Sequence, residues 1–115
     1  MADAFHDREK AFEAKYQLDQ ELEFRARARR NKLLGLWAAE SMGMAGGGAE
    51  AYARQVVAAD LEHHGDEGVI AKVLKDLEEH DVDMTEGRLQ IKLEKMMAIA
   101  REQIMTEAGG TPAAR

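Results

Sequence analysis

The 115-residue sequence contains no cysteine and only one proline. Without cysteine it has no disulfide, no thiolate nucleophile and no cysteine-based metal site. Aromatic residues make up 5% of the chain and β-branched residues are scarce, which argues against a β-sheet protein. No apolar run approaches the roughly 20 residues that a membrane-spanning helix needs, so we expect no membrane-embedded part. Hydrophobic residues are 45% and charged residues 33% of the chain. This composition predicts a single small all-α domain.

The charge is spread unevenly along the chain. The formal net charge is −6, yet one short stretch carries five positive side chains, namely Arg25, Arg27, Arg29, Arg30 and Lys32. An acidic protein with one basic stripe is a poor nucleic-acid binder, so we expect no nucleic-acid partner. The stripe is better suited to an acidic protein surface or to a few phosphates.

Apolar spacing and glycine stops predict four helices, at about 18–44, 49–64, 67–80 and 84–107. Short loops between them imply a small four-helix bundle with a long first helix. In that helix, Leu33, Leu36 and Trp37 share one face with Glu40, and Trp37 is the predicted buried anchor of the core. Gly35, beside this row, is expected to let another helix approach closely.

The helix ends also carry sequence signals. Gly43 and the Gly46–Gly48 run are expected to end the first helix and form a flexible turn. Asp66 is the predicted N-cap of the third helix, and the Asp-x-x-Glu pattern of Asp83 and Glu86 predicts the start of the fourth. The four-helix domain is thus expected to cover residues 18–108, and residues 109–115 are expected to be a disordered tail.

Residues 1–17 differ from the rest because they are charged and carry few large apolar groups. On a helix, Phe5, Phe12 and Tyr16 would fall within about 40° of one another. One narrow aromatic stripe cannot bury enough surface to fold alone. Two interpretations remain: a frayed extension of the next helix, or a mobile segment that becomes helical in a partner's groove.

The residues give no pattern typical of catalysis. Ser41 is the only serine, and no histidine follows it at a catalytic spacing. Asp60, His64 and His80 are suitable ligand types for zinc, but two helix ends would have to meet to bring them together. We therefore predict a protein that is not an enzyme, with no catalytic residue and no metal site.

Four blocks of the sequence resemble a known family. FHDREKAFEAKY, RARARRNKLLGLWAAE, AEAYARQVV and HGDEGVIAKVLKDL are similar to the zeta subunit of alphaproteobacterial F-type ATP synthase. The resemblance covers nearly the whole chain, from Phe5 to the fourth helix. RRNKLLGLWAAE is the most specific part of the resemblance, because a run of that length with basic, aromatic and glycine residues rarely recurs by chance.

The resemblance implies a four-helix inhibitor whose N-terminal segment, here Ala2–Gln17, inserts into the catalytic head of the synthase and blocks rotation in the direction of ATP hydrolysis. It implies a cytoplasmic protein that associates with the membrane through the synthase and is a monomer when free. The residues expected to contact this partner are Phe5, Arg8, Phe12, Tyr16, Arg27 and Arg30.

A second function remains open beside the first. A nucleotide-binding regulatory module would hold phosphates with basic side chains and stack an aromatic ring on the base. The residues that would serve are Arg25, Arg29, Lys32, Trp37 and Tyr52. No cofactor is required by either interpretation, and binding of ATP or ADP is expected to be weak.

Overall fold

A computed structural model describes the backbone of residues 2–63 and 65–109, with side chains at 19–62 and 65–109. Its four helices are α1 (Ala2–Ser41), α2 (Gly46–His63), α3 (Asp66–Glu79) and α4 (Glu86–Glu107), and the described residues include no strand. The prediction of an all-α, four-helix protein with a long first helix is confirmed. The predicted tail lies outside the described residues, apart from Gly109.

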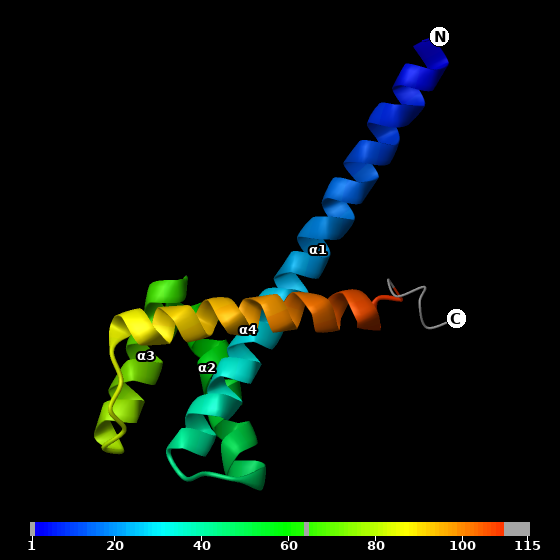
Figure 1. Cartoon of the computed structure of the whole chain (residues 1–115). Coiled ribbons are helices and arrows are strands. Elements are labelled where there is room, and N and C mark those ends of the chain that lie inside the picture. Colours follow the sequence, from blue (N-terminus) through cyan, green and yellow to red (C-terminus); the bar gives the residue numbers. More distant parts are fainter. Residues whose placement is uncertain (1, 64, 110–115) are drawn as a thin grey trace.

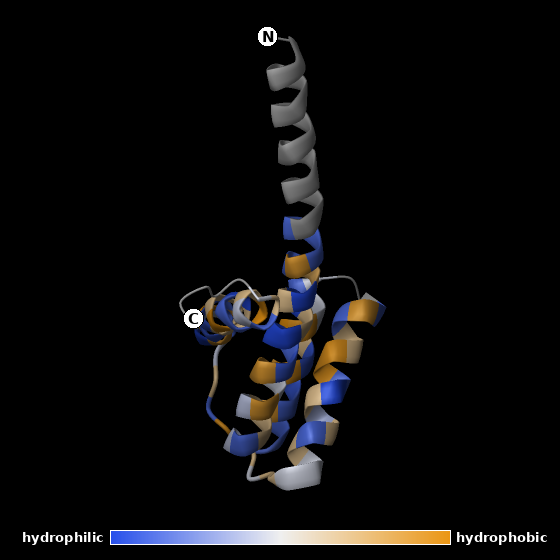
Figure 2. Ribbon diagram, turned by 90° about the vertical axis from the view of Figure 1, so that its right-hand side faces the viewer, coloured by the Kyte–Doolittle hydropathy of each residue, from blue (hydrophilic) through white to orange (hydrophobic). Residues whose placement is uncertain are grey.

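Helix α1 is the central element of the bundle. It packs against each of the other three helices, and α3 also packs against α2 and α4, whereas the described parts of α2 and α4 have no Cα atoms within 8 Å of each other. The N-terminal part of α1 projects away from the other helices, and α4 crosses α1 where this projection begins (Figure 1). Along the bundle, hydrophobic and hydrophilic segments alternate on the ribbons (Figure 2), as expected of helices with one buried face.

The predicted boundary of the first helix is wrong at both ends. α1 begins at Ala2 rather than near Leu18, so residues 2–17 continue the same helix. It ends at Ser41 because Gly43 adopts a left-handed φ of 86°. There the Met44 N–H donates to Ala39 O (2.8 Å) and the Gly43 N–H donates to Glu40 O (3.0 Å). These are the two backbone hydrogen bonds of a Schellman motif.

Three other predictions about helix ends need correction. Gly46–Gly48 is the first turn of α2 rather than a free loop. Asp66 is the first residue of α3 and makes no capping bond. α4 is capped by Thr85, whose hydroxyl accepts from the Arg88 N–H (3.2 Å), and not by the Asp83 pattern.

No glycine marks the end of α3 in the sequence. Asp81 adopts a φ of 59°, and the Val82 N–H donates to Leu77 O (2.9 Å). The turn repeats the geometry at the end of α1 with a residue other than glycine. It places half-buried Val82 against the core, and this packing offsets the cost of the left-handed conformation.

The buried face of α1 is rotated from the predicted one. Leu33, Leu36 and Trp37 are only partly buried, and Lys92 Nζ lies 4.9 Å from the centroid of the Trp37 ring. Fully buried instead are Ala26, Leu34, Ala38 and Ala39. Trp37 is therefore an edge residue and not the anchor of the core. Ala26 belongs to a second buried cluster with Ala100 and Ile104. The main core contains the other three and Ala49, Tyr52, Val56, Val69, Ile70, Val73, Leu77, Leu89 and Leu93.

Close packing explains why small residues occupy this face. A Cβ atom added at Gly35 would lie 2.6 Å from Ala53 Cα and 3.2 Å from Val56 Cγ2, so α1 and α2 meet almost backbone to backbone there. The expectation that Gly35 admits a neighbouring helix is confirmed. Large side chains are excluded from this seam and lie on its flanks.

This contact predicts the effect of adding one methyl group. Gly35→Ala should lower the free energy of unfolding by about 1–3 kcal/mol, because the backbone of α2 must move away. The control is Gly87→Ala in the first turn of α4, where a Cβ would meet nothing within 4 Å; it should be neutral or stabilising by up to about 1 kcal/mol. Urea unfolding followed by circular dichroism measures both. Equal stability of the two variants would contradict the close approach.

Candidate functional site

The basic run of α1 divides into buried and exposed side chains. Arg30 is 5% exposed, Arg27 and Arg29 are intermediate, and Arg25 and Lys32 are exposed. Of the two residues of this run that were expected to contact the partner, Arg27 is partly exposed and Arg30 is buried. Whether either residue touches a partner stays a prediction.

Asp60 of α2 is the acceptor at the centre of this region. Arg27 donates to both of its oxygens, through Nε (2.7 Å) and Nη2 (2.8 Å), and Asn31 Nδ2 donates to Oδ2 (2.7 Å). The Asp60 side chain is 10% exposed. The hydrogen bonds from Arg27, then that from Asn31 and the charges of Arg27 and Arg30, hold the pKa of Asp60 down at about 2, against the opposing effect of burial.

Arg30 extends this network to the start of α3. Its Nε donates to Asn31 Oδ1 (3.0 Å), and its Nη2 lies 3.0 Å from Asp66 Oδ1 and 3.8 Å from Asp60 Oδ2. These last contacts are ionic, without the alignment of a hydrogen bond. The network, defined here as the polar cluster of Arg27, Arg30, Asn31, Asp60 and Asp66, joins α1, α2 and α3. Its two acids compensate the charges of two of the five basic residues, Arg27 and Arg30.

The five residues considered for nucleotide binding are not brought into one pocket. Tyr52 is 5% exposed, and its hydroxyl donates to Asp76 Oδ2 (2.7 Å), so its ring is not free to stack. Burial and this hydrogen bond raise the pKa of Tyr52. Arg25 is twelve residues from Trp37 on α1, about 18 Å along the helix. ATP or ADP binding stays a prediction that this geometry does not favour.

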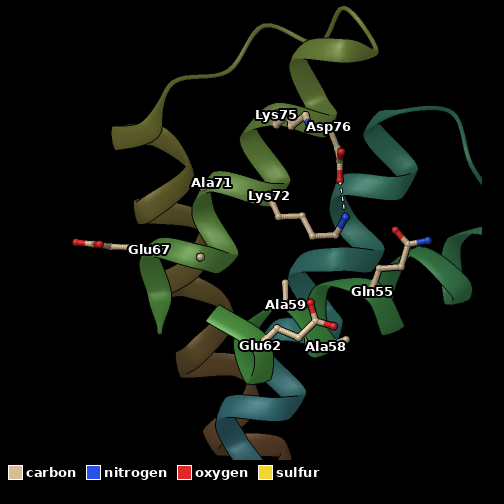
Figure 3. A pocket seen from close by; sticks show the side chains of 10 residues that line it. Gln55, Ala58, Ala59, Glu62, Glu67, Ala71, Lys72, Lys75 and Asp76 are labelled. Carbon is tan, nitrogen blue, oxygen red and sulfur yellow. Dashed lines mark hydrogen bonds and ion pairs between the residues drawn. The ribbon is translucent and has the colours of Figure 1, made fainter. Parts of the chain in front are cut away.

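A cavity of about 750 Å³ lies between α2 and α3. Small residues Ala58, Ala59 and Ala71 form part of its lining, and Figure 3 shows Glu62 and Glu67 apart from Lys72 and its acceptor Asp76. Acids and bases thus do not converge on one point, as they would around a reacting group. Within the described residues, no group of three or more His, Asp or Glu is placed to hold a metal ion.

The residues considered for chemistry also have ordinary surroundings. The Ser41 hydroxyl donates to Trp37 O (3.1 Å), one turn earlier in α1. His64 of the considered zinc set lies outside the described residues, and His80 Nδ1 lies 2.8 Å from Asp76 O at the end of α3. Over the part of the chain that the structure describes, no helix is both long and apolar enough to cross a bilayer.

The N-terminal part of α1, residues 2–18, is called the arm below. Its backbone is helical and continuous with the bundle. The predicted contact residues Phe5, Arg8, Phe12 and Tyr16 belong to it, and their side chains lie outside the described ones. The first described contacts between α1 and α4 are made by Leu22, which packs against the Ala26 cluster, and by Glu23, which pairs with Arg101. The molecule is thus a helical body that presents a helical arm.

Comparisons with known proteins agree with this architecture. Residues 1–103 match the family described as ATPase inhibitor subunit zeta, so the chain belongs to that family. A protein whose structure was solved in solution by NMR is 48% identical, with a TM-score of 0.66, and the match covers 75% of this chain and 98% of that one. Comparison with curated protein sequences gives no match. Membership supports an inhibitory role at an ATPase rather than catalysis by this chain.

The polar cluster predicts a large effect of removing its central acid. Asp60→Ala leaves Arg27 and Asn31 without their shared acceptor and removes one of the two acids that lie beside the buried Arg30 guanidinium, which should cost about 3–5 kcal/mol of stability. Glu50→Ala, an exposed acid on the same helix, should change stability by less than about 1 kcal/mol. Thermal unfolding of both proteins at neutral pH tests this. If Asp60→Ala has the same melting temperature as Glu50→Ala, the polar cluster is not needed for stability.

The cluster also predicts acid sensitivity. The pKa of Asp60 is about 2 in the folded protein against 3.8 for the free group, so its stabilising effect is complete above about pH 5 and is lost as pH falls toward 2. The loss should be about 2 kcal/mol. Urea unfolding at pH 6 and pH 2.5 measures it. The pH-dependent loss should shrink in Asp60→Asn, and an equal loss in that variant would assign the effect to other acids.

Proposed function

We propose that this chain inhibits ATP hydrolysis by F-type ATP synthase, by inserting its arm into the catalytic head of the enzyme. It acts from the cytoplasmic side and is a monomer when free. The observation that supports this most directly is the length of α1. Only its part from about Leu22 onward is used to build the bundle, and about 30 Å of helix remains before it.

The arm has the features of a segment that binds in a groove. Its sequence places Phe5, Phe12 and Tyr16 near one helical face among charged neighbours, and spaced apolar anchors are how an amphipathic helix enters a groove between protein surfaces. A rigid helix between subunits that must move past one another adds a barrier to rotation. This kind of inhibition needs no catalytic residue and no cofactor.

The bundle contributes to binding by nucleating the helix of the arm. An isolated helix of 17 residues is marginal in water because its first turn is costly to form. Here residues 22–41 of α1 are already held in a helix by their packing in the bundle. The arm only has to extend this helix residue by residue, without a new nucleus. Less ordering free energy is then lost on binding. The predicted mobility of residues 1–17 remains part of this proposal.

Truncation tests the proposal. Removing residues 1–17 should leave the bundle folded and abolish inhibition of ATP hydrolysis by the isolated catalytic head. Phe12→Ala should weaken inhibition by about 2–4 kcal/mol of binding free energy if Phe12 is a main anchor, with little change in melting temperature. The matched control is Phe24→Ala, an exposed phenylalanine of the same helix outside the arm (68% exposed).

Two measurements decide the outcome. Circular dichroism reports whether each variant keeps its helices and melting temperature, and the ATPase assay reports the concentration for half inhibition. If the truncated protein inhibits at the wild-type concentration, the inhibitory element lies in the bundle.

A further inference from the structure

A groove of about 420 Å³ lies between α3 and α4, which pack only lightly against each other. Its floor is apolar and is formed by Ile70 and Leu74 of α3 and by Leu93 of α4. Ile70 and Leu74 are four residues apart and therefore lie on one face of α3. Ile70 and Leu93 are buried, whereas Leu74 is only half-buried. The groove thus offers apolar surface to a side chain that enters it from outside.

The rim of this groove is acidic. Glu67 of α3 and Glu86 and Glu94 of α4 line it, and all three are exposed. No lysine, arginine or histidine is among the described residues that line it. The apolar floor and these three glutamates together are called the acidic groove below.

The three glutamates are not compensated by the described part of the molecule. Within it, no basic group forms an ion pair or hydrogen bond with Glu67, Glu86 or Glu94. This differs from the acids of the polar cluster, each of which lies beside an arginine. The neighbouring cavity, next to Met97, is lined by three arginines, but each of these is already paired with another acid.

The helix dipoles account for only part of this arrangement. Glu67 and Glu86 lie in the first turns of α3 and α4, where acids are stabilised by the dipole. Glu94 lies eight residues after the start of α4, and the effect of the dipole is confined to the first turn. The carboxylate of Glu94 therefore has neither a described partner nor a favourable helix end, and a base from outside would supply the missing partner.

We propose that the acidic groove binds a helix of the partner in which apolar side chains are flanked by Lys or Arg. That the partner is the catalytic head rests on the function proposed above. A helix suits the groove because two helices form its sides, and a third helix packs between them by the usual interlocking of side-chain ridges. Its apolar side chains would enter between Leu74 and Leu93, and its basic side chains would pair with the glutamates of the rim.

The acidic groove then gives the chain a second contact with the partner of the arm. Two contacts on one partner bind more tightly than either contact does alone, because the second forms within an existing complex. The bundle would in this way hold the chain on the catalytic head, while the arm provides the block to rotation.

Charge reversal tests the groove. Glu94→Lys should weaken binding of the chain to the isolated catalytic head about tenfold, because like charges then meet across the interface. The concentration for half inhibition should rise in proportion. The matched control, Glu102→Lys, makes the same change at an exposed position of α4 outside the groove lining. It should bind and inhibit as the wild type does, and both variants should keep the wild-type melting temperature, since exposed substitutions change stability little.

Photocrosslinking identifies the occupant. The chain has no cysteine, so Gln90→Cys, in the groove lining, can carry a single benzophenone group. With the isolated catalytic head, this label should link to a helical segment in which Lys or Arg flanks apolar residues. Arg88→Cys lies on the same helix, exposed and outside the groove lining, and the same label there should give little of this product.

The outcomes separate the groove from the function of the arm. Equal binding by Glu94→Lys and Glu102→Lys overturns the groove, as does a Gln90→Cys label that links to an acidic segment, to a second copy of the chain or to nothing. Inhibition by the wild-type chain would stand in each of these cases. If the wild-type chain binds the catalytic head without inhibiting it, the proposed function fails instead, and the binding of the two variants and the crosslink still decide the groove.

Discussion

The buried guanidinium of Arg30 is the point on which the bundle depends. It lies on α1, reaches the acids of α2 and α3 within 4 Å, and is almost fully removed from water. A charge in such a place is costly unless it is paired. α2 and α3 are therefore held where their carboxylates compensate it, and Asn31 links the same groups by hydrogen bonds. The apolar seam around Gly35 then fixes how closely α1 and α2 approach.

α1 thus has two environments along one continuous helix. From Leu22 to Ser41 it is the central element of a small core, with contacts to all three other helices. Before that it is the arm, to which the function proposed above gives a partner outside the molecule. A stable bundle can in this way present a helix that would not form by itself.

The sequence alone was sufficient for the class of fold, because helix formers, apolar periods and the stop at Gly43 are local signals. The sequence alone was not sufficient to predict which face of α1 is buried. Large residues such as Trp37 were expected inside, whereas close packing against α2 favours Ala and Gly there. The partners of the basic run could not be predicted either, since Asp60 is 33 residues from Arg27 and Glu107 is 78 residues from Arg29. The family resemblance, by contrast, was readable in four short blocks.

The continuity of α1 has a mechanical consequence. A sideways force on the first residues of the helix acts about 36 Å from Ala26, which is buried against α4. A load on the arm is therefore carried by the contacts of α1 with the other three helices, and an unbent arm can tilt only if these contacts are disturbed.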